Sequence, residues 1–211
     1  MTSITSGQRK QFRRLFEDTL EKAGLDKAGA QIILGKGDEF QDNILAFVRK
    51  QAISTWKTIK LGTGLKTADD FRKAIKAKGM KIGNWANDIL GKSAFVAAKG
   101  ETEIDLVLVT VAELGFKSGA RYDQICGRAK ELGLEFCPSE VGPQLRLQYE
   151  DQPEGEWVLI GMEPLSGSGG GLGVFYVEHD DDGRRLRGVD GGPGDFWDGH
   201  DRWVFVRPRR K

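Results

Sequence analysis

The chain has 211 residues, of which 39% are hydrophobic and 30% charged, and its formal net charge is +1. This composition is typical of a soluble globular protein, and the length suits one large domain or two small ones. The sequence has no apolar run of roughly 20 residues and no signal-peptide pattern at its start, so we expect a cytoplasmic protein with no membrane contact.

The small net charge hides an uneven distribution along the chain. Residues 1–100 have 19 basic and 10 acidic side chains, a charge of +9, whereas residues 101–211 have 13 and 21, a charge of −8. The densest basic segment is 49–81, which contains ten basic residues and only two acidic ones, Asp69 and Asp70. Such asymmetry indicates a contact with nucleic acid or an acidic partner. It is also typical of two halves that pack on each other, or of lysine-rich helices exposed to solvent.

Residues 1–53 predict a module of three helices. The first spans Ser6 to Ala23, the second runs from its N-cap Asp26 to Leu34, and the third runs from Asp38 to about Ile53. A helix-turn-helix reader of DNA would need basic or amide side chains at the start of its recognition helix. The third helix begins with DEFQDN, which would repel phosphates, so a plain helical bundle is favoured.

The next segment predicts a short strand at 55–61, a helix from its N-cap Thr67 to Gly79, and a short helix at 85–90. The helix that begins after Thr67 is strongly basic outside its apolar face. If the protein binds a polyanion, we expect this helix and the preceding strand to make the contact. The residues expected to carry it are Lys57, Lys60, Lys66, Arg72, Lys73, Lys76 and Lys78.

The apolar, β-branched run at 104–111 predicts a strand, with a helix as the alternative, and Arg121 to Leu132 predict an amphipathic helix. Cys126, on the apolar face of that helix, and Cys137, after it, are the only cysteines. Two thiols in a cytoplasmic chain are expected to be free, so we predict no disulfide. Their spacing excludes a CxxC redox pair, and no cluster of ligand-type residues surrounds them.

The segment 140–164 predicts a β-hairpin. Leu145, Leu147 and Tyr149 alternate with polar residues as in a half-buried strand, and 157–160 is a continuous apolar run. Further strands are predicted at 174–179, 184–189 and 202–207. We therefore predict an α+β protein with a helical module (1–53) and a mixed domain (54–211). The last half of that domain, about 143–207, would be an antiparallel sheet of about five strands, either a small sheet or a partly closed barrel.

Two acidic loops contain the only histidines. His179 precedes Asp180, Asp181 and Asp182, and His200 is flanked by Asp195, Asp198 and Asp201. If the loops meet, His179 and His200 could act as an acid–base pair, and Asp180, Asp182 and Asp198 could bind a divalent ion. Turn chemistry explains both loops as well and is the favoured interpretation. Nothing fixes the ligand spacing, so the sequence predicts no cofactor and no defined metal site.

Trp197 lies among glycines and aspartates in the second acidic loop. A large aromatic residue in such a loop either closes one end of the sheet as a plug or contacts a ligand or partner.

Several strings resemble a group of uncharacterised bacterial proteins of unknown function. They are WANDILGKSAF at 85–95, VAELGF at 111–116, AKELGLEFCPSEVGPQLRLQY at 129–149 and RWVFVR at 202–207. The resemblance covers about residues 55–211, while LEKAGLDKAGAQ at 20–31 and GDEF at 37–40 resemble an N-terminal helical module on other uncharacterised bacterial proteins. It implies a bacterial, cytoplasmic setting and no particular activity.

The charge distribution and the absence of a catalytic motif favour a non-enzymatic binding or adaptor protein. Its basic face at 49–81 would bind nucleic acid or an acidic partner. A small hydrolase or nuclease that uses the loops at 179–182 and 195–201 is the alternative. A purely structural subunit of a larger assembly is the third class that the sequence allows.

Overall fold

The structure is a computed structural model that describes residues 4–24, 26–40, 43–44 and 53–209. The chain divides into two compact units, residues 1–48 (unit 1) and residues 49–211 (unit 2). Each unit is described by itself below.

Unit 1 contains helices α1 (Ser6–Lys22) and α2 (Lys27–Gly35), as the sequence predicts. Thr5 and Gln8 form a capping box at the start of α1, and the side chain of Asp26 accepts a hydrogen bond from the backbone N–H of Gly29 to cap α2. Of the predicted third helix, residues 38–40 and 43–44 are helical and the rest, up to residue 52, lies outside the described residues.

Unit 2 is built on a curled sheet with the strand order β1-β3-β10-β5-β7-β8-β2, and β6 pairs with β7 beside this path. A separate two-stranded sheet pairs β4 with β9. The strands are β1 (Lys57–Leu61), β2 (Lys81–Ile82), β3 (Thr102–Thr110), β4 (Ala120–Arg121), β5 (Glu156–Ile160), β6 (Leu165–Ser166), β7 (Leu172–Asp180), β8 (Gly183–Asp190), β9 (Phe196–Trp197) and β10 (Arg202–Arg207).

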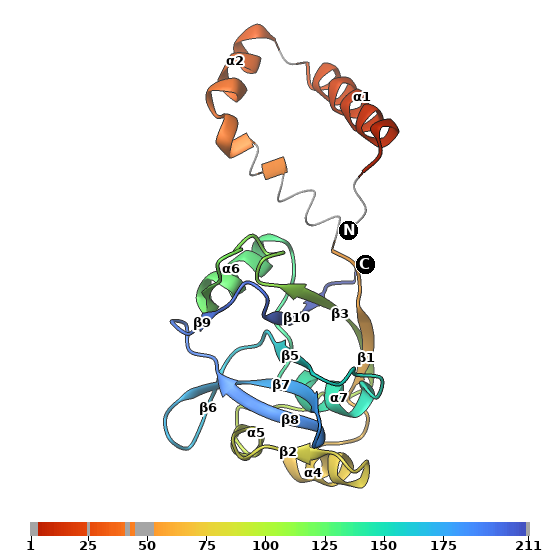
Figure 1. The fold of residues 1–211 in the computed structure, drawn as a ribbon, viewed down its shortest axis with the longest axis vertical. Helices are drawn as coiled ribbons and strands as arrows, with labels where there is room; N and C mark the ends of the chain where they lie inside the picture. The colour runs from red at the N-terminus through yellow and green to blue at the C-terminus, as the bar shows by residue number, and fades with distance from the viewer. Residues whose placement is uncertain (1–3, 25, 41–42, 45–52, 210–211) are drawn as a thin grey trace. The chain divides into compact units, whose positions relative to one another are not determined.

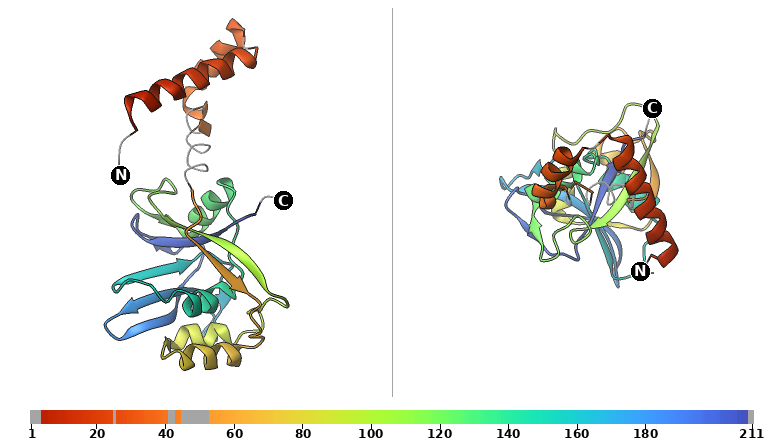
Figure 2. Two further views of the ribbon diagram at one scale, coloured as in Figure 1. Left: turned by 90° about the vertical axis from the view of Figure 1, so that its right-hand side faces the viewer. Right: turned by 90° about the horizontal axis from the view of Figure 1, so that it is seen from above.

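Four helices cover this sheet (Figure 1). Helices α4 (Ala68–Ala77) and α5 (Asn84–Leu90) lie together beside β2 and β8 at one end, and α6 (Tyr122–Glu131) lies at the other end near β3 and β10. Helix α7 (Val141–Gln148) lies inside the curve of the sheet, between β1 on one side and β5 and β7 on the other (Figure 2). The hydrophobic core of unit 2 therefore extends on both sides of α7.

The α+β class is confirmed, but the prediction of a five-stranded antiparallel sheet is wrong. The sheet is larger and mixed, because β10 pairs with β5 in parallel and β8 pairs with β2 in parallel. Strands β1 and β3, which precede the predicted β half, belong to the same sheet. The order of strands depends on contacts between distant segments, which periodicity within a segment does not encode.

The prediction of a first hairpin strand around residues 143–150 is also wrong, because residues 141–148 form helix α7. The alternation of apolar and polar residues suggested one exposed face, yet every residue from Val141 to Leu147 is buried. Arg146 and Gln144 are polar side chains inside the core, so polarity did not mark the solvent side here. The second strand of the hairpin is confirmed as β5.

Helix α7 presents polar side chains at i, i+4 and i+8 to the free edge of β1. Gln148 pairs with Lys60 as a neighbouring strand would, accepting from its N–H at 2.9 Å and donating to its carbonyl oxygen at 2.7 Å. The buried carboxylate of Glu140 accepts from the backbone N–H groups of Gly62 (2.9 Å) and Ala98 (2.7 Å). These contacts satisfy an edge that would otherwise be open to another strand.

Arg146 is fully buried and donates to uncharged acceptors. Its guanidinium bonds to the side chain of Gln152 and to the carbonyl oxygens of Glu178 (3.1 Å) and Tyr149 (2.6 Å). Burial, followed by the nearby charge of Arg184, lowers the pKa of Arg146 to about 10, so the guanidinium stays charged at neutral pH. Arg146 therefore joins the end of α7 to β7 and to the loop that follows the helix.

Two helical glycines of unit 2 are expected to respond oppositely to alanine. A Cβ at Gly142 in α7 would lie 2.6 Å from the Phe175 ring, whereas a Cβ at Gly127 in α6 would have no atom within 4 Å. We expect Gly142→Ala to lower the free energy of unfolding by about 1–3 kcal/mol through overpacking. We expect Gly127→Ala to raise it by about 0.5–1 kcal/mol through helix propensity.

Denaturant unfolding of the two variants measures both changes, and Gly127→Ala serves as the matched control. Equal effects of the two substitutions would contradict the close contact between α7 and β7.

Candidate functional site

Four of the seven residues of the predicted basic face are engaged in salt bridges within unit 2. Lys57 pairs with Asp151 (3.1 Å) and Lys60 with Glu101 (2.8 Å). Arg72 pairs with Asp69 and Lys78 with Glu150. Lys57 also lies over the Tyr149 ring, 4.6 Å from its centroid. These four cations therefore already have intramolecular partners.

The other three residues, Lys66, Lys73 and Lys76, are exposed and have no salt bridge among the described residues. Lys73 and Lys76 are three residues apart on α4 and so lie on one side of the helix. Lys66 lies just before the N-cap Thr67 of the same helix. We call these three residues the α4 lysine patch.

His179 and the aspartates after it form a hairpin turn with internal partners. The Nδ1 atom of His179 lies 2.6 Å from the carbonyl oxygen of Gln152. A carbonyl oxygen can only accept a hydrogen bond, so Nδ1 is the donor and carries the proton. Asp180 and Asp182 both pair with Arg185. The hydrogen bonds to Arg185, in particular, lower the pKa of the Asp182 carboxyl below its usual range. This turn is thus held together by the strands that it connects.

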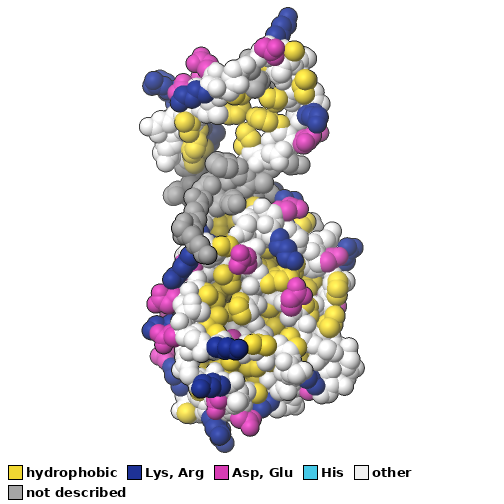
Figure 3. Space-filling model, turned by 180° about the vertical axis from the view of Figure 1, so that it is seen from behind, with side chains coloured by type: hydrophobic (Ala, Val, Ile, Leu, Met, Phe, Trp, Pro, Cys, Tyr) yellow, Lys and Arg dark blue, Asp and Glu magenta, His cyan; other side chains and the backbone are white. Residues whose placement is uncertain are grey.

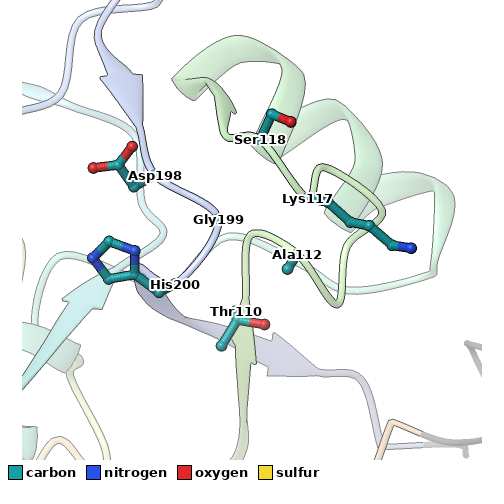
Figure 4. A pocket seen from close by; sticks show the side chains of 7 residues that line it. All are labelled: Thr110, Ala112, Lys117, Ser118, Asp198, Gly199 and His200. Atoms are coloured by element: carbon teal, nitrogen blue, oxygen red, sulfur yellow. The ribbon is translucent and has the colours of Figure 1, made fainter.

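His200 lies beside an open hollow of about 520 Å³, whose lining also includes Asp198, Lys117 and Ser118 but not His179. Figure 4 shows His200 and Asp198 on one side of this hollow, with the side chain of Lys117 extending away from them. Asp201, the residue after His200, is buried and accepts a hydrogen bond from the N–H of Asp198. Burial raises the pKa of the Asp201 carboxyl.

Among the described residues, no group of three or more His, Cys, Asp or Glu side chains is arranged to hold a metal ion. Asp180, Asp182 and Asp198 are therefore not brought together as ligands in the part of the chain that the structure describes. Cys126 and Cys137 are both free and buried, and burial raises the pKa of the Cys126 thiol to about 12. A thiol with that pKa stays protonated at neutral pH and is a weak nucleophile.

Trp197 is only 7% exposed and packs edge-on against Trp203, with the ring centroids 5.0 Å apart. This position fits the interpretation of Trp197 as a plug at the end of the sheet. Its neighbour Phe196 is 61% exposed, so the β9 loop buries one aromatic ring and presents the other to solvent.

The sequence did not reveal a clamp that holds the glycine-rich segment 167–171 on α5. Asp88 accepts from the N–H of Ser168 (2.7 Å) and from its hydroxyl (2.6 Å), and Lys92 contacts both residues. These hydrogen bonds, led by those of Ser168, lower the pKa of Asp88 to about 2. Lys92 therefore ties α5 and the glycine-rich segment together through its contacts with both residues.

A second hollow, of about 510 Å³, lies between α6 and the loops before β6 and after β8. Its walls include the Tyr122, Phe136 and Leu172 side chains, and Lys130 sits 4.3 Å from the centroid of the Phe136 ring. No motif in the sequence pointed to it, because the residues come from four separate segments.

Comparison with protein-family models, curated proteins and solved structures finds no match for this chain. No described helix is both long enough and apolar enough to cross a membrane. The arguments about function below therefore depend on the residues of this chain alone.

The Asp88 clamp is expected to open in acid. The pKa of Asp88 is lowered in the folded protein, so its contribution is complete above the ordinary pKa and is lost as pH falls from about 4 toward about 2. We expect the amide resonance of Ser168 to report this loss in an NMR titration over that range.

Asp88→Ala should give the acid form of the Ser168 resonance at every pH, whereas Asp181→Ala, at an exposed turn, should leave the titration unchanged. A Ser168 amide that is insensitive to both pH and Asp88→Ala would contradict the clamp.

Proposed function

We propose that the protein is a non-enzymatic binding or adaptor protein whose unit 2 contacts an acidic protein segment through the α4 lysine patch. The observation that supports this proposal is that the predicted basic face divides into cations with a salt bridge and cations without one. Lys66, Lys73 and Lys76 are exposed without a salt bridge among the described residues, while the other four cations are occupied. Uncompensated charge on one side of a helix favours an oppositely charged partner.

The size of the patch favours an acidic protein segment over a nucleic acid. Proteins that bind duplex DNA through its backbone commonly neutralise about 6–10 phosphates. Three lysines would neutralise about three, and Asp69 and Asp70 in the first turn of α4 would oppose a long polyanion. A short run of carboxylates matches the number of ammonium groups, although Asp70, which accepts from the N–H of Lys66 (3.0 Å), lies beside the patch and would reduce the attraction.

The charge pattern of the molecular surface is consistent with a localised contact. On the face shown in Figure 3, positive and negative side chains of unit 2 are interspersed. This face therefore carries no extended positive potential, and attraction at the α4 lysine patch would be short-ranged and sensitive to salt.

The test is a salt titration of binding to a glutamate-rich peptide, with DNA and RNA oligonucleotides measured in parallel. We expect Lys73→Glu/Lys76→Glu to weaken peptide binding by about tenfold or more at low salt, because attraction becomes repulsion at two sites. The matched control is Lys117→Glu/Lys130→Glu, which makes the same charge change at exposed lysines outside α4.

Equal loss in both double variants would mean that only net charge matters, and the α4 lysine patch would be abandoned. Binding to nucleic acid with a salt slope near −3 or steeper, and none to the peptide, would replace the acidic protein partner by nucleic acid.

A small hydrolase is the second candidate, favoured by the hollow that gathers His200 and Asp198. An exposed imidazole beside a carboxylate can exchange protons with a bound substrate or water. The nuclease version would need metal ligands from residues other than the three aspartates named above.

On the hydrolase alternative, His200→Asn should lower turnover of a phosphoester or ester substrate by about 100-fold, the usual contribution of a general acid or base. Ser118→Ala, at the same hollow, is the control for non-specific damage. Wild-type protein without turnover on a broad substrate panel, or turnover unchanged by His200→Asn, would rule this alternative out.

A further inference from the structure

Helix α1 of unit 1 exposes a stripe of large apolar side chains. Phe12 is 62% exposed, Leu15 63% and Phe16 40%, and no residue of α1 is buried. Phe16 has one aromatic neighbour, Phe40, with the ring centroids 6.0 Å apart. Figure 3 shows hydrophobic side chains of unit 1 open to view. The stripe is thus the largest apolar feature left exposed in the described part of this unit.

An apolar stripe that is exposed to solvent does not contribute to the stability of its helix. None of the described side chains of unit 1 is classed as buried. An isolated helix of about this length is marginal in water, and most helices in proteins are stabilised by packing of their apolar face. The apolar face of α1 is therefore expected to be covered by a surface beyond the described residues of its unit.

The order of charges along α1 indicates what that surface is. The first half contains Arg9, Lys10, Arg13 and Arg14, and the second half contains Glu17, Asp18 and Glu21. The first turn has no acidic residue, and apart from Lys22 the arrangement opposes the macrodipole of the helix. Charges that oppose the dipole of their own helix are expected to be compensated by a contact with another part of the assembly. The sequence of α1 is complementary to itself when a second α1 runs in the opposite direction.

We propose that α1 pairs antiparallel with α1 of a second copy of this chain. Phe12, Leu15 and Phe16 would form the centre of the interface, and Arg13 of each copy would lie opposite Glu17 of the other. The antiparallel arrangement places each basic half beside an acidic half, and the two helix dipoles also compensate. This inference concerns unit 1 and does not depend on the function proposed for unit 2.

Helical geometry separates interface charges from charges that face away. At about 100° per residue, Arg13 and Glu17 border the apolar stripe on the side of Leu20. Arg14 and Glu21 fall on the side opposite Phe12 and are exposed. These two pairs have the same charges and provide an interface set and a matched control set.

The first experiment is sedimentation of the full chain over a wide range of concentrations. We expect a reversible dimer, and we expect Phe12→Ser to weaken it by about 100-fold or more, because two aromatic side chains lose their burial. Phe12 is mostly exposed in the single chain, so this substitution should leave unit 2 folded. A chain that remains monomeric up to its solubility limit would overturn the proposal, including the case in which another part of the same chain covers α1.

The second experiment uses charge reversal and mixing. Arg13→Glu alone and Glu17→Arg alone should each weaken the dimer by about tenfold, because each creates two repulsive pairs. Mixing the two variants should restore dimers that contain one chain of each kind. Both variants also lose an i,i+4 pair within the helix, but mixing cannot restore that pair. Recovery therefore reports the contact between copies.

The control variants Arg14→Glu and Glu21→Arg should dimerise like the wild type, alone or mixed. If they weaken the dimer as much as the interface variants, the dimer is not formed through this face of α1.

Orientation is tested by crosslinking cysteines placed near the two ends of the helix. Gln8→Cys chains mixed with Lys22→Cys chains should crosslink to each other, and neither should crosslink to itself. Self-crosslinking of each variant would show parallel pairing and contradict the charge argument. The native Cys126 and Cys137 are buried and should not interfere.

Discussion

The position of α7 inside the curled sheet is the constraint on which unit 2 depends. Its polar row contacts the backbone on the β1 side, through Gln148 and Glu140, and Arg146 contacts the backbone of β7 on the other. Each such hydrogen bond contributes about 1 kcal/mol net, but a buried donor or acceptor left alone costs more. The helix therefore joins two distant parts of one sheet and satisfies the free edge of β1, which an apolar helix of the same shape could not do.

This arrangement also pairs part of the basic first half of the chain with the acidic second half. Lys57 and Lys78, from the basic first half, pair with Asp151 and Glu150, which directly follow α7 in the acidic second half. The solvent-exposed pairs contribute little stability individually, about 0–1 kcal/mol each. They do orient the lysines toward the protein, so a count of basic residues overstates the charge available to a partner. What remains outward on α4 is a small patch rather than a basic face.

The sequence was informative where local rules act and misleading where distant contacts decide. The helix caps Thr67 and Asp26 and the apolar runs of β3 and β10 follow from residue patterns within a few positions. Helix α7 does not, because the partners of its buried polar side chains come from other segments. Gln144 donates to the hydroxyl of Thr63, and Arg146 donates to the carbonyl oxygen of Glu178. The candidate sites behave in the same way. The hydrogen bond of His179 to Gln152, and the engagement of Lys57 by Tyr149, join residues 27 and 92 positions apart, and no local spacing encodes them.

The two units differ in how completely each satisfies its own side chains. Unit 2 buries most of its large apolar residues, with Phe196 among the exceptions, and gives its buried charged residues Glu140 and Arg146 hydrogen-bond partners. Unit 1 has capped helices but leaves aromatic side chains exposed and arranges charges against its own helix dipole. A sequence that specifies good caps and a regular apolar stripe is built to be a helix, so its exposed face is not explained as a failure to fold. On the proposal made above, the missing stabilisation comes from association. Self-association of α1 would also bring two copies of unit 2 onto one assembly, so that two weak α4 lysine patches could bind one acidic partner with increased avidity.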